Sequence, residues 1–201
     1  MNKNTFSSKH SAAFSLIEML LVLGVLAVLL IAAFVVYPKV RDNSRAQTEA
    51  VNVRIIQTNL RNLFIAKGFG YGGLGGQPNN QTPSIANKAR AFPVSMNGGD
   101  YSTGASVTSA WGGDVFVWSR PAIVTPLGSL LAGQAFGLVY RNVPPGICIP
   151  WVSSLSSDFH SILVGIAGEQ TEVLTKTGLN VQALTTACNS TDNIEVTFTS
   201  I

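Results

Sequence analysis

Phe14-Ser15-Leu16-Ile17-Glu18 leads into an apolar run that has no charged side chain from Met19 to Tyr37. About 20 apolar residues, at a rise of 1.5 Å each, match the ~30 Å hydrocarbon core of a bilayer. A helix is expected there, because in lipid a helix satisfies its own backbone hydrogen bonds. Glu18 stands at the entrance to this run. Because a charged carboxylate is unfavourable near hydrocarbon, Glu18 is a candidate functional residue.

The segment before the run, residues 1–13, is polar and carries Lys3 and Lys9. A secretory signal peptide places a short apolar stretch before its cleavage site. Here the basic segment directly precedes the apolar helix, and residues 34–39 offer no small-residue site at the end of the run. We therefore expect the helix to be retained and residues 1–13 to be a cytoplasmic leader under the positive-inside rule. Basic residues beyond the run weaken this charge argument: Lys39, Arg41 and Arg45.

A second helical pattern follows Pro38 and reaches Lys67. Proline removes a helical hydrogen bond, so we expect Pro38 to kink or loosen the helix where residues 14–38 meet residues 39–67. Apolar residues in the second half recur at spacings of three and four, which predicts one stripe packed on a globular domain. The stripe consists of Ala46, Ala50, Val53, Ile56, Leu60 and Leu63 or Phe64. The charged residues are expected to lie largely off the stripe: Arg41, Asp42, Arg45, Glu49, Arg54 and Arg61.

The remaining chain, residues 68–201, is predicted to form one globular domain. Gly68 and Gly70 are expected to end the helix and begin a glycine-rich stretch, residues 68–76. This stretch lacks the Gly-Lys-Ser/Thr ending of a phosphate-binding loop and follows a helix instead of a strand. We therefore interpret it as a flexible connection.

Strand patterns are frequent in the second half of the chain. Residues 115–118 and 135–140 are short apolar runs, and residues 194–200 alternate strictly, which predicts a half-buried strand. A short helix is expected at residues 84–91. A longer helix is expected at residues 153–166, where apolar residues recur at helical spacing: Leu155, Phe159, Ile162, Leu163 and Ile166. This order of elements indicates an α+β fold with an antiparallel sheet.

The chain has two cysteines, Cys148 and Cys188. Two cysteines form no structural zinc site without further ligands, and neither His10 nor His160 lies at metal-ligand spacing from them. In an exported domain a disulfide is the natural interpretation, with two buried free thiols as the alternative. A bridge would close a loop of about 40 residues and stabilise the fold by about 4 kcal/mol in the chain-entropy model.

No catalytic, cofactor-binding or metal-binding residue is expected. A general base needs a partner and a nucleophile within hydrogen-bond reach, and no such motif surrounds His160 or any serine. Glu169 and Glu172 are interpreted as a solvated turn or helix end. The net charge of +3 includes the two lysines of the leader, so we do not expect a nucleic-acid partner.

The residues from Ala13 to Leu20 resemble the class III signal of type IV prepilins and type II secretion pseudopilins. The resemblance implies that a membrane aspartyl protease, the prepilin peptidase, cuts between Ala13 and Phe14 and N-methylates Phe14. Glu18 then occupies the position of the family's glutamate, the fifth residue of the mature chain. Ala13 departs from the family, which almost always has glycine before the cut.

Later segments resemble type IVb pilins, above all the thin-pilus (PilS-type) pilins of enteric bacteria and conjugative plasmids. They are Trp111-Gly-Gly, Asn142-Val-Pro, Ala187-Cys-Asn and the last strand. The resemblance implies the type IV pilin fold, in which a long N-terminal helix is half transmembrane and half packed on an antiparallel sheet. It also implies that a disulfide between Cys148 and Cys188 bounds a variable surface region.

The resemblance implies a major pilin as the function. The precursor is expected in the inner membrane, where a pilus ATPase and an inner-membrane platform assemble it into a homopolymeric extracellular filament. That filament would serve adhesion, aggregation or mating-pair contact. The amine of Phe14 in one subunit is expected to pair with Glu18 of another, because charges attract strongly in a low dielectric. One alternative is a minor pilin or type II secretion pseudopilin; another is a single-span surface or periplasmic protein outside this system.

Overall fold

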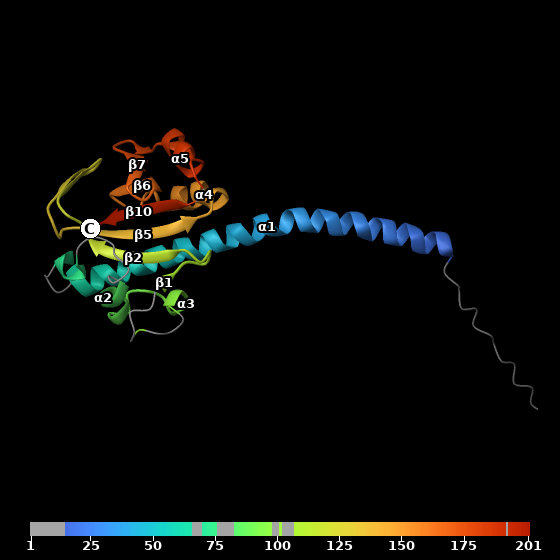
Figure 1. Ribbon diagram of the computed structural model, residues 1–201, viewed down its shortest axis with the longest axis horizontal. Coiled ribbons are helices and arrows are strands. Elements are labelled where there is room, and N and C mark those ends of the chain that lie inside the picture. The colour runs from blue at the N-terminus through green and yellow to red at the C-terminus, as the bar shows by residue number, and fades with distance from the viewer. Residues whose placement is uncertain (1–14, 66–69, 76–82, 98–100, 102–106, 192) are drawn as a thin grey trace, which may run out of the picture. The chain divides into compact units, whose positions relative to one another are not determined.

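The computed structural model describes residues 15–65, 70–75, 83–97, 101, 107–191 and 193–201 (Figure 1). The chain divides into two units between Arg41 and Asp42. We call the second unit, residues 42–201, the head. Ala13 and Phe14, at the expected cleavage site, lie outside the described residues.

Helix α1 runs from Leu16 to Leu60 and includes Pro38. It begins at Ser15, whose carbonyl accepts hydrogen bonds from the N–H groups of Glu18 and Met19. Its length and composition are sufficient to cross a membrane. The long N-terminal helix of the predicted fold class is thus confirmed. A π-helical turn, Arg61–Ile65, follows α1 directly, whereas Gly68, the expected end of the helix, lies outside the described residues.

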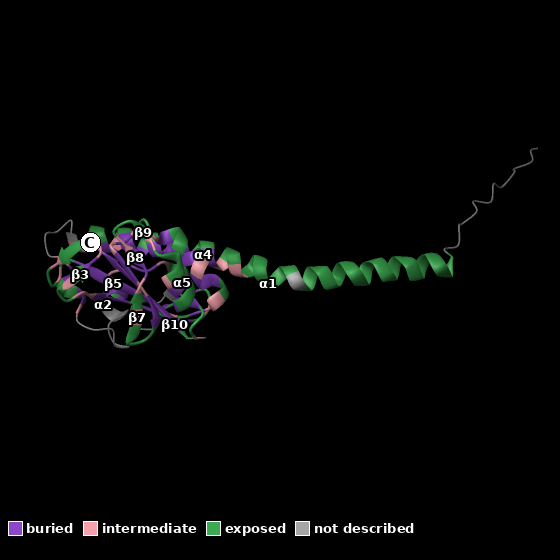
Figure 2. Cartoon of the chain, turned by 90° about the horizontal axis from the view of Figure 1, so that it is seen from above, coloured by how far each residue is buried: buried purple, intermediate pink, exposed green. Residues whose placement is uncertain are grey.

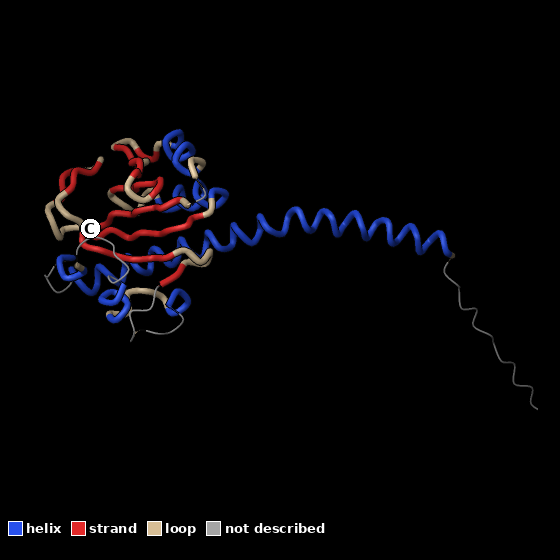
Figure 3. Tube along the Cα trace, in the orientation of Figure 1, coloured by secondary structure: helices blue, strands red, loops and turns tan. Residues whose placement is uncertain are grey.

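The head contains an antiparallel sheet of six strands, in the order β1-β2-β5-β10-β6-β7 (Figures 1 and 3). Two small hairpins accompany it, β3 with β4 and β8 with β9. The sheet strands are β1 (Val107–Thr108), β2 (Asp114–Ser119), β5 (Phe136–Val143), β6 (Ser161–Ile166), β7 (Glu169–Glu172) and β10 (Ile194–Ser200). The hairpin strands are β3 (Ile123–Thr125), β4 (Gly128–Leu130), β8 (Leu174–Thr175) and β9 (Gly178–Leu179). The predicted α+β class is therefore confirmed.

Short helices complete the head. They are η2, a 3-10 turn (Tyr71–Leu74), α2 (Pro83–Lys88), α3 (Val94–Asn97), α4 (Pro145–Leu155) and α5 (Val181–Cys188). Pro144 caps α4 and Pro145 occupies its first turn, where a proline loses no helical hydrogen bond. The side chain of Asn180 caps α5 by accepting from the N–H of Ala183 at 3.0 Å.

The main core lies between the stripe of α1 and one face of the sheet. Figure 2 shows the buried residues in purple. The buried stripe residues are Ala46, Ala50, Val53, Ile56 and Leu60. From the sheet, every second residue of β5 and β10 joins them: Phe136, Leu138, Tyr140, Ile194, Val196 and Phe198. The alternate residues point to the opposite face, which we call the outer face; there Phe116, Trp118 and Val139 form a second, smaller cluster.

One predicted element was wrong. Residues 153–166 were expected to form a helix, but α4 ends at Leu155 and strand β6 begins at Ser161. Apolar spacing in so short a segment fits both periods. The strand prevails because β6 pairs with β10 from Ser161 to Gly165, so that its backbone groups are satisfied while Ile162 and Val164 are buried.

Strand β10 also differs from expectation, because it is buried on both faces instead of one. It lies between β5 and β6 in the middle of the sheet. Its polar residues Glu195, Thr197 and Thr199 point to the outer face, where long side chains cover them: Arg141 bonds Glu195, and Gln170 bonds Glu195 and Thr197. Strict alternation in the sequence therefore predicted which residues of β10 share a face. It did not predict that long side chains bury the polar face as well.

Candidate functional site

Glu18 lies in the first turn of α1, and its side chain is exposed. A helix N-terminus carries a partial positive charge, which favours a carboxylate in the first turn. All side chains from residue 16 to residue 34 are likewise exposed. The first part of α1 therefore presents a carboxylate at the start of a continuous apolar surface. The predicted partner of Glu18, the amine of Phe14, lies outside the described residues.

The apolar surface of this part of α1 consists of large side chains on all sides of the helix. Examples are Leu16, Leu21, Leu26, Ile31 and Phe34, whose exposed fractions range from 48% to 78%. Burying one such side chain is favourable by about 1.5–3 kcal/mol. A helix that is apolar all round belongs in a bilayer or among other apolar helices.

Pro38 lies inside α1, and helical residues continue on both sides of it. Its predicted kink or loosening of the helix stays a prediction.

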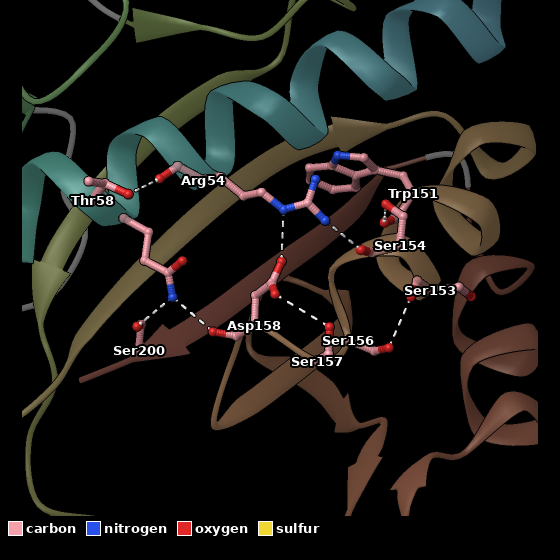
Figure 4. Close-up of polar contacts among 10 residues, drawn as sticks. Arg54, Thr58, Trp151, Ser153, Ser154, Ser156, Ser157, Asp158 and Ser200 are labelled. Carbon is pink, nitrogen blue, oxygen red and sulfur yellow. Dashed lines mark hydrogen bonds and ion pairs between the residues drawn. The ribbon is translucent and has the colours of Figure 1, made fainter.

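Arg54 holds the second half of α1 to the loop after α4 (Figure 4). Its Nε lies 2.9 Å from the Oδ2 of Asp158, and its Nη2 donates to the carbonyl of Ser154 at 2.9 Å. Both side chains of this ion pair remain partly exposed, so the pair itself contributes at most about 1 kcal/mol. It joins the second half of α1 to the C-terminal end of α4 and to the loop that follows.

Gln57 and Arg61 attach α1 to the last strand. The buried amide of Gln57 donates to the carbonyl of Asp158 at 2.8 Å and to the hydroxyl of Ser200 at 2.9 Å. Arg61 donates to the oxygen of Ile201 at 2.6 Å and to Ser200 at 3.1 Å. The last turn of α1 and the π-helical turn after it thus bind the loop at Asp158 and the C-terminal residues Ser200 and Ile201.

Glu49 is a buried carboxylate on the same side of α1, with 1% of its surface exposed. Its Oε1 accepts from the N–H of Ala110 at 2.6 Å, while its Oε2 has no hydrogen-bond partner. Burial raises the pKa of Glu49, and nearby Asn52 and Tyr140 offset part of that rise. The expectation that Glu49 lies off the stripe was wrong. Its spacing of three from Ala46 and four from Val53 places it on the buried side.

Cys148 and Cys188 form a disulfide, as predicted, with a Cα–Cα distance of 5.8 Å. Both residues are buried. The bridge joins α4 to the end of α5 and encloses the segment that contains strands β6, β7, β8 and β9. It therefore fixes both ends of that segment, including the surface hairpin β8–β9.

Glu169, Glu172 and His160 are the titratable residues that the sequence analysis weighed for catalysis. Glu172 lies on β7, not in a turn or helix end as expected, and its Oε1 accepts from the N–H groups of Ile162 and Leu174 at 2.9 and 3.1 Å. Its Oε2 accepts from the hydroxyl of Ser161. Glu169 begins the same strand. Burial and the charge of Arg61 lower the pKa of His160.

Two family models match the chain. The model described as PilS N terminal matches residues 43–201, and the model of a prokaryotic N-terminal methylation motif matches residues 8–34. The second match includes the Ala13–Phe14 pair and Glu18. No curated protein matches the chain significantly.

Two solved pilin structures are similar to the chain. One is TcpA, a type IV pilin from Vibrio cholerae El Tor biotype, with 17% identity and a TM-score of 0.49; the match covers 79% of this chain and 99% of that one. The other is a type IV b pilin from Salmonella typhi, with 20% identity and a TM-score of 0.48; it covers 76% of this chain and 97% of that one.

Proposed function

We propose that this chain, which belongs to the PilS family of type IV pilins, is the major subunit of a type IVb pilus. Family membership makes it a structural pilin, processed by a prepilin peptidase and polymerised into a pilus filament. The observation that carries the finer proposal is the uncovered apolar surface of α1, residues 16–34. Such a surface needs two environments in turn, the inner membrane before assembly and neighbouring α1 helices afterwards.

Division of the chain follows from this proposal. Residues 1–13 are the leader that the peptidase removes, and residues 14–38 are the membrane anchor and later the filament core. Residues 39–67 join the anchor to the extracellular globular domain, residues 68–201. The pilus ATPase and the inner-membrane platform extract the anchor from the bilayer during assembly.

Glu18 sets the register of assembly in this proposal. Cleavage before Phe14 creates a positive amine close to Glu18 in the sequence, and the first turns of neighbouring helices bring the amine of one subunit to the carboxylate of another. Away from water the attraction between the two charges is strong, and a single unpaired charge there is strongly unfavourable. The apolar side chains provide adhesion, whereas the charge pair selects one axial position.

The globular domains form the outer surface of the filament and mediate adhesion, aggregation or mating-pair contact. The rigid attachment of α1 through Arg54, Gln57 and Arg61 supports this role. These contacts join the end of α1 and the turn after it to α4, to the loop at Asp158 and to the C-terminal residues, so a force on the outer domain would pass into the helix through them.

Mass spectrometry of purified filaments tests the proposal. The expected result is a mature chain that starts at N-methyl-Phe14 and makes up most of the filament protein. Filaments should also be absent from a strain that lacks the gene. Retention of residues 1–13 in the filament would refute the processing, and abundant filaments in the deletion strain would refute the role of major subunit.

A further inference from the structure

A cavity of about 420 Å³ lies in the head between the η2 turn and the end of β2. Its walls include Gly72, Gly75, Trp118, Arg120, Pro121 and Ala132. Gly72 and Gly75 belong to the glycine-rich stretch, residues 68–76, which we interpreted from the sequence as a flexible connection. Instead, the turn is packed in place: the N–H of Tyr71 donates to the carbonyl of Gly133 at 2.8 Å, and the Tyr71 ring is buried.

Among the described residues that line this cavity, Arg120 is the only charged one, and its backbone is held by hydrogen bonds. Its N–H donates to Ala135 at 2.9 Å, and its carbonyl accepts from Gly133 at 3.0 Å. Its guanidinium lies 4.9 Å from the centre of the Trp118 ring. Arg120 takes part in neither of the ion pairs Arg54–Asp158 and Arg141–Glu195. Burial lowers the pKa of Arg120, and the negative charge of Glu172 offsets part of that fall; a bound anion would favour the charged form in the same way.

Buried polar atoms without partners lie on the strands beside the cavity. The Nε1 of Trp118, the Nε of Arg120 and the Oγ1 of Thr199 all lack a hydrogen bond. Trp118 is 8% exposed and Thr199 is fully buried. The two residues flank Gly137, which pairs with Trp118 on β2 and with Thr199 on β10. Native proteins rarely leave such groups unpaired, but these atoms have almost no accessible surface, so they do not themselves contact a ligand in the cavity.

Gly137 leaves room for the side chains of Trp118 and Arg120 to pack directly against the backbone of the sheet. A Cβ atom at Gly137 would stand 2.5 Å from the Nε1 of Trp118 and 3.1 Å from the Cδ of Arg120. Any larger residue would displace the indole and the stem of the arginine. The glycine therefore fixes the position from which Arg120 faces the cavity.

We propose that this cavity binds the carboxylate of an acidic sugar through Arg120. A guanidinium matches a carboxylate with two parallel N–H donors, and one that is already oriented loses less entropy on binding. The volume falls within the usual range of ligand sites and suits one or two sugar rings. Glycine walls expose peptide groups to sugar hydroxyls, and Pro121 and Ala132 supply an apolar surface.

The site is a property of the single head, since its residues all belong to the second unit. Its test therefore needs no filament. Failure of the test would leave the proposed pilus function unaffected, and loss of filament assembly in another experiment would leave this site unaffected.

Ligand-detected NMR on the full chain in detergent micelles tests the assignment. D-glucuronate and D-glucose are matched probes, because they differ only in a carboxylate in place of a hydroxymethyl group. The expected result is saturable binding of glucuronate that is at least about tenfold tighter than that of glucose and weakens at high salt. Equal binding of the two sugars would overturn the proposal, as would equal binding of acetate, which carries the carboxylate without the ring.

Three variants locate the site. R120Q should weaken glucuronate binding at least about tenfold, a loss of ~1.4 kcal/mol. The matched control is R90Q, because Arg90 also lies over an aromatic ring, Tyr101, and is exposed; its binding should equal that of the wild type. A132F, a change at an exposed position in the wall, should block the cavity while Arg120 stays in place. Unchanged binding in either R120Q or A132F would refute the site, and absence of saturable binding in the wild type would mean that only water occupies it.

Discussion

At the scale of single residues, two carboxylates on α1 have opposite environments. Glu18 is exposed beside apolar side chains, and Glu49 is buried in the head. Glu18 belongs to a motif and was recognised from the sequence. Glu49 was overlooked because its charge was weighed above its spacing, although positions 46, 49 and 53 share one side of a helix.

Glu18→Gln is expected to leave cleavage intact and to reduce the yield of filaments by more than about tenfold. The reason is that, in the proposed filament, Glu18 pairs with the amine of Phe14, and removing one member of a buried charge pair leaves the other unpaired, at ~3–5 kcal/mol. Quantitative immunoblotting of sheared filaments and of the membrane fraction measures both steps. Ser15→Ala, a change at an exposed neighbouring position, is the control. A wild-type filament yield from Glu18→Gln would contradict the pairing role.

Glu49→Gln is expected to stabilise the head at pH 7 by on the order of 1 kcal/mol, because an uncharged amide avoids the burial of a charge. Since the folded-state pKa of Glu49 is raised, its carboxyl binds its proton more tightly in the folded chain than in the unfolded one. The wild type should therefore lose stability as the pH rises from 4.5, the ordinary pKa of a glutamate carboxyl, through the raised folded-state pKa.

Urea unfolding of the full chain in detergent at pH 4 and pH 7 measures this effect. The stability difference between wild type and Glu49→Gln should be smaller at pH 4, where both side chains are neutral. If stability depends on pH identically in the two proteins, the pKa of Glu49 is the same in the folded and unfolded states, which would contradict the prediction.

At the scale of elements, the contacts that hold the second half of α1 to the rest of the head differ in burial and should differ in energy. Gln57→Ala should lower the free energy of unfolding by ~1–3 kcal/mol, because its amide is buried and bonds both Asp158 and Ser200. Arg54→Ala should cost only about 0.5–1 kcal/mol, since its ion pair is partly exposed.

Thermal or urea unfolding of the two variants gives the comparison. Thr58→Ala is the control, because its exposed hydroxyl bonds only the carbonyl of Arg54 within the helix. The order of destabilisation should be Gln57, then Arg54, then Thr58. A larger loss at Arg54 than at Gln57 would mean that the ion pair, not the buried amide, attaches the helix.

The elements that sequence reasoning identified are those with a long, regular pattern. The stripe of α1 continues over several turns, and the alternation of β10 continues over seven residues, Ile194–Ser200. The β6 segment failed because a short apolar run fits a helix and a strand equally well, and its pairing with β10 comes from distant residues. The cavity at Arg120 was missed for a similar reason. Trp118, Gly137 and Thr199 meet only through the register of three strands.

At the scale of the whole molecule, the disulfide is expected to decide whether the head stays folded. Replacing both Cys148 and Cys188 with alanine should lower the free energy of unfolding by about 4 kcal/mol, a large part of the 5–15 kcal/mol that is typical of a domain. Urea unfolding of the full chain, compared with the oxidised wild type, measures the loss.

The double alanine variant avoids burying a hydroxyl group in the core, so the loss reports the bridge itself. Wild type treated with a reducing agent should unfold at the same urea concentration as the variant. A midpoint equal to that of the oxidised wild type would show that packing between α4 and α5 suffices without the bond.

The central position of β10 has a consequence for biogenesis. A translocon delivers the chain from the N-terminus onward, so β5 and β6 emerge before the strand that must lie between them. Until β10 arrives, both carry unpaired edges, which are prone to wrong pairing and aggregation. The sheet of the head is therefore complete only after β10 has been exported.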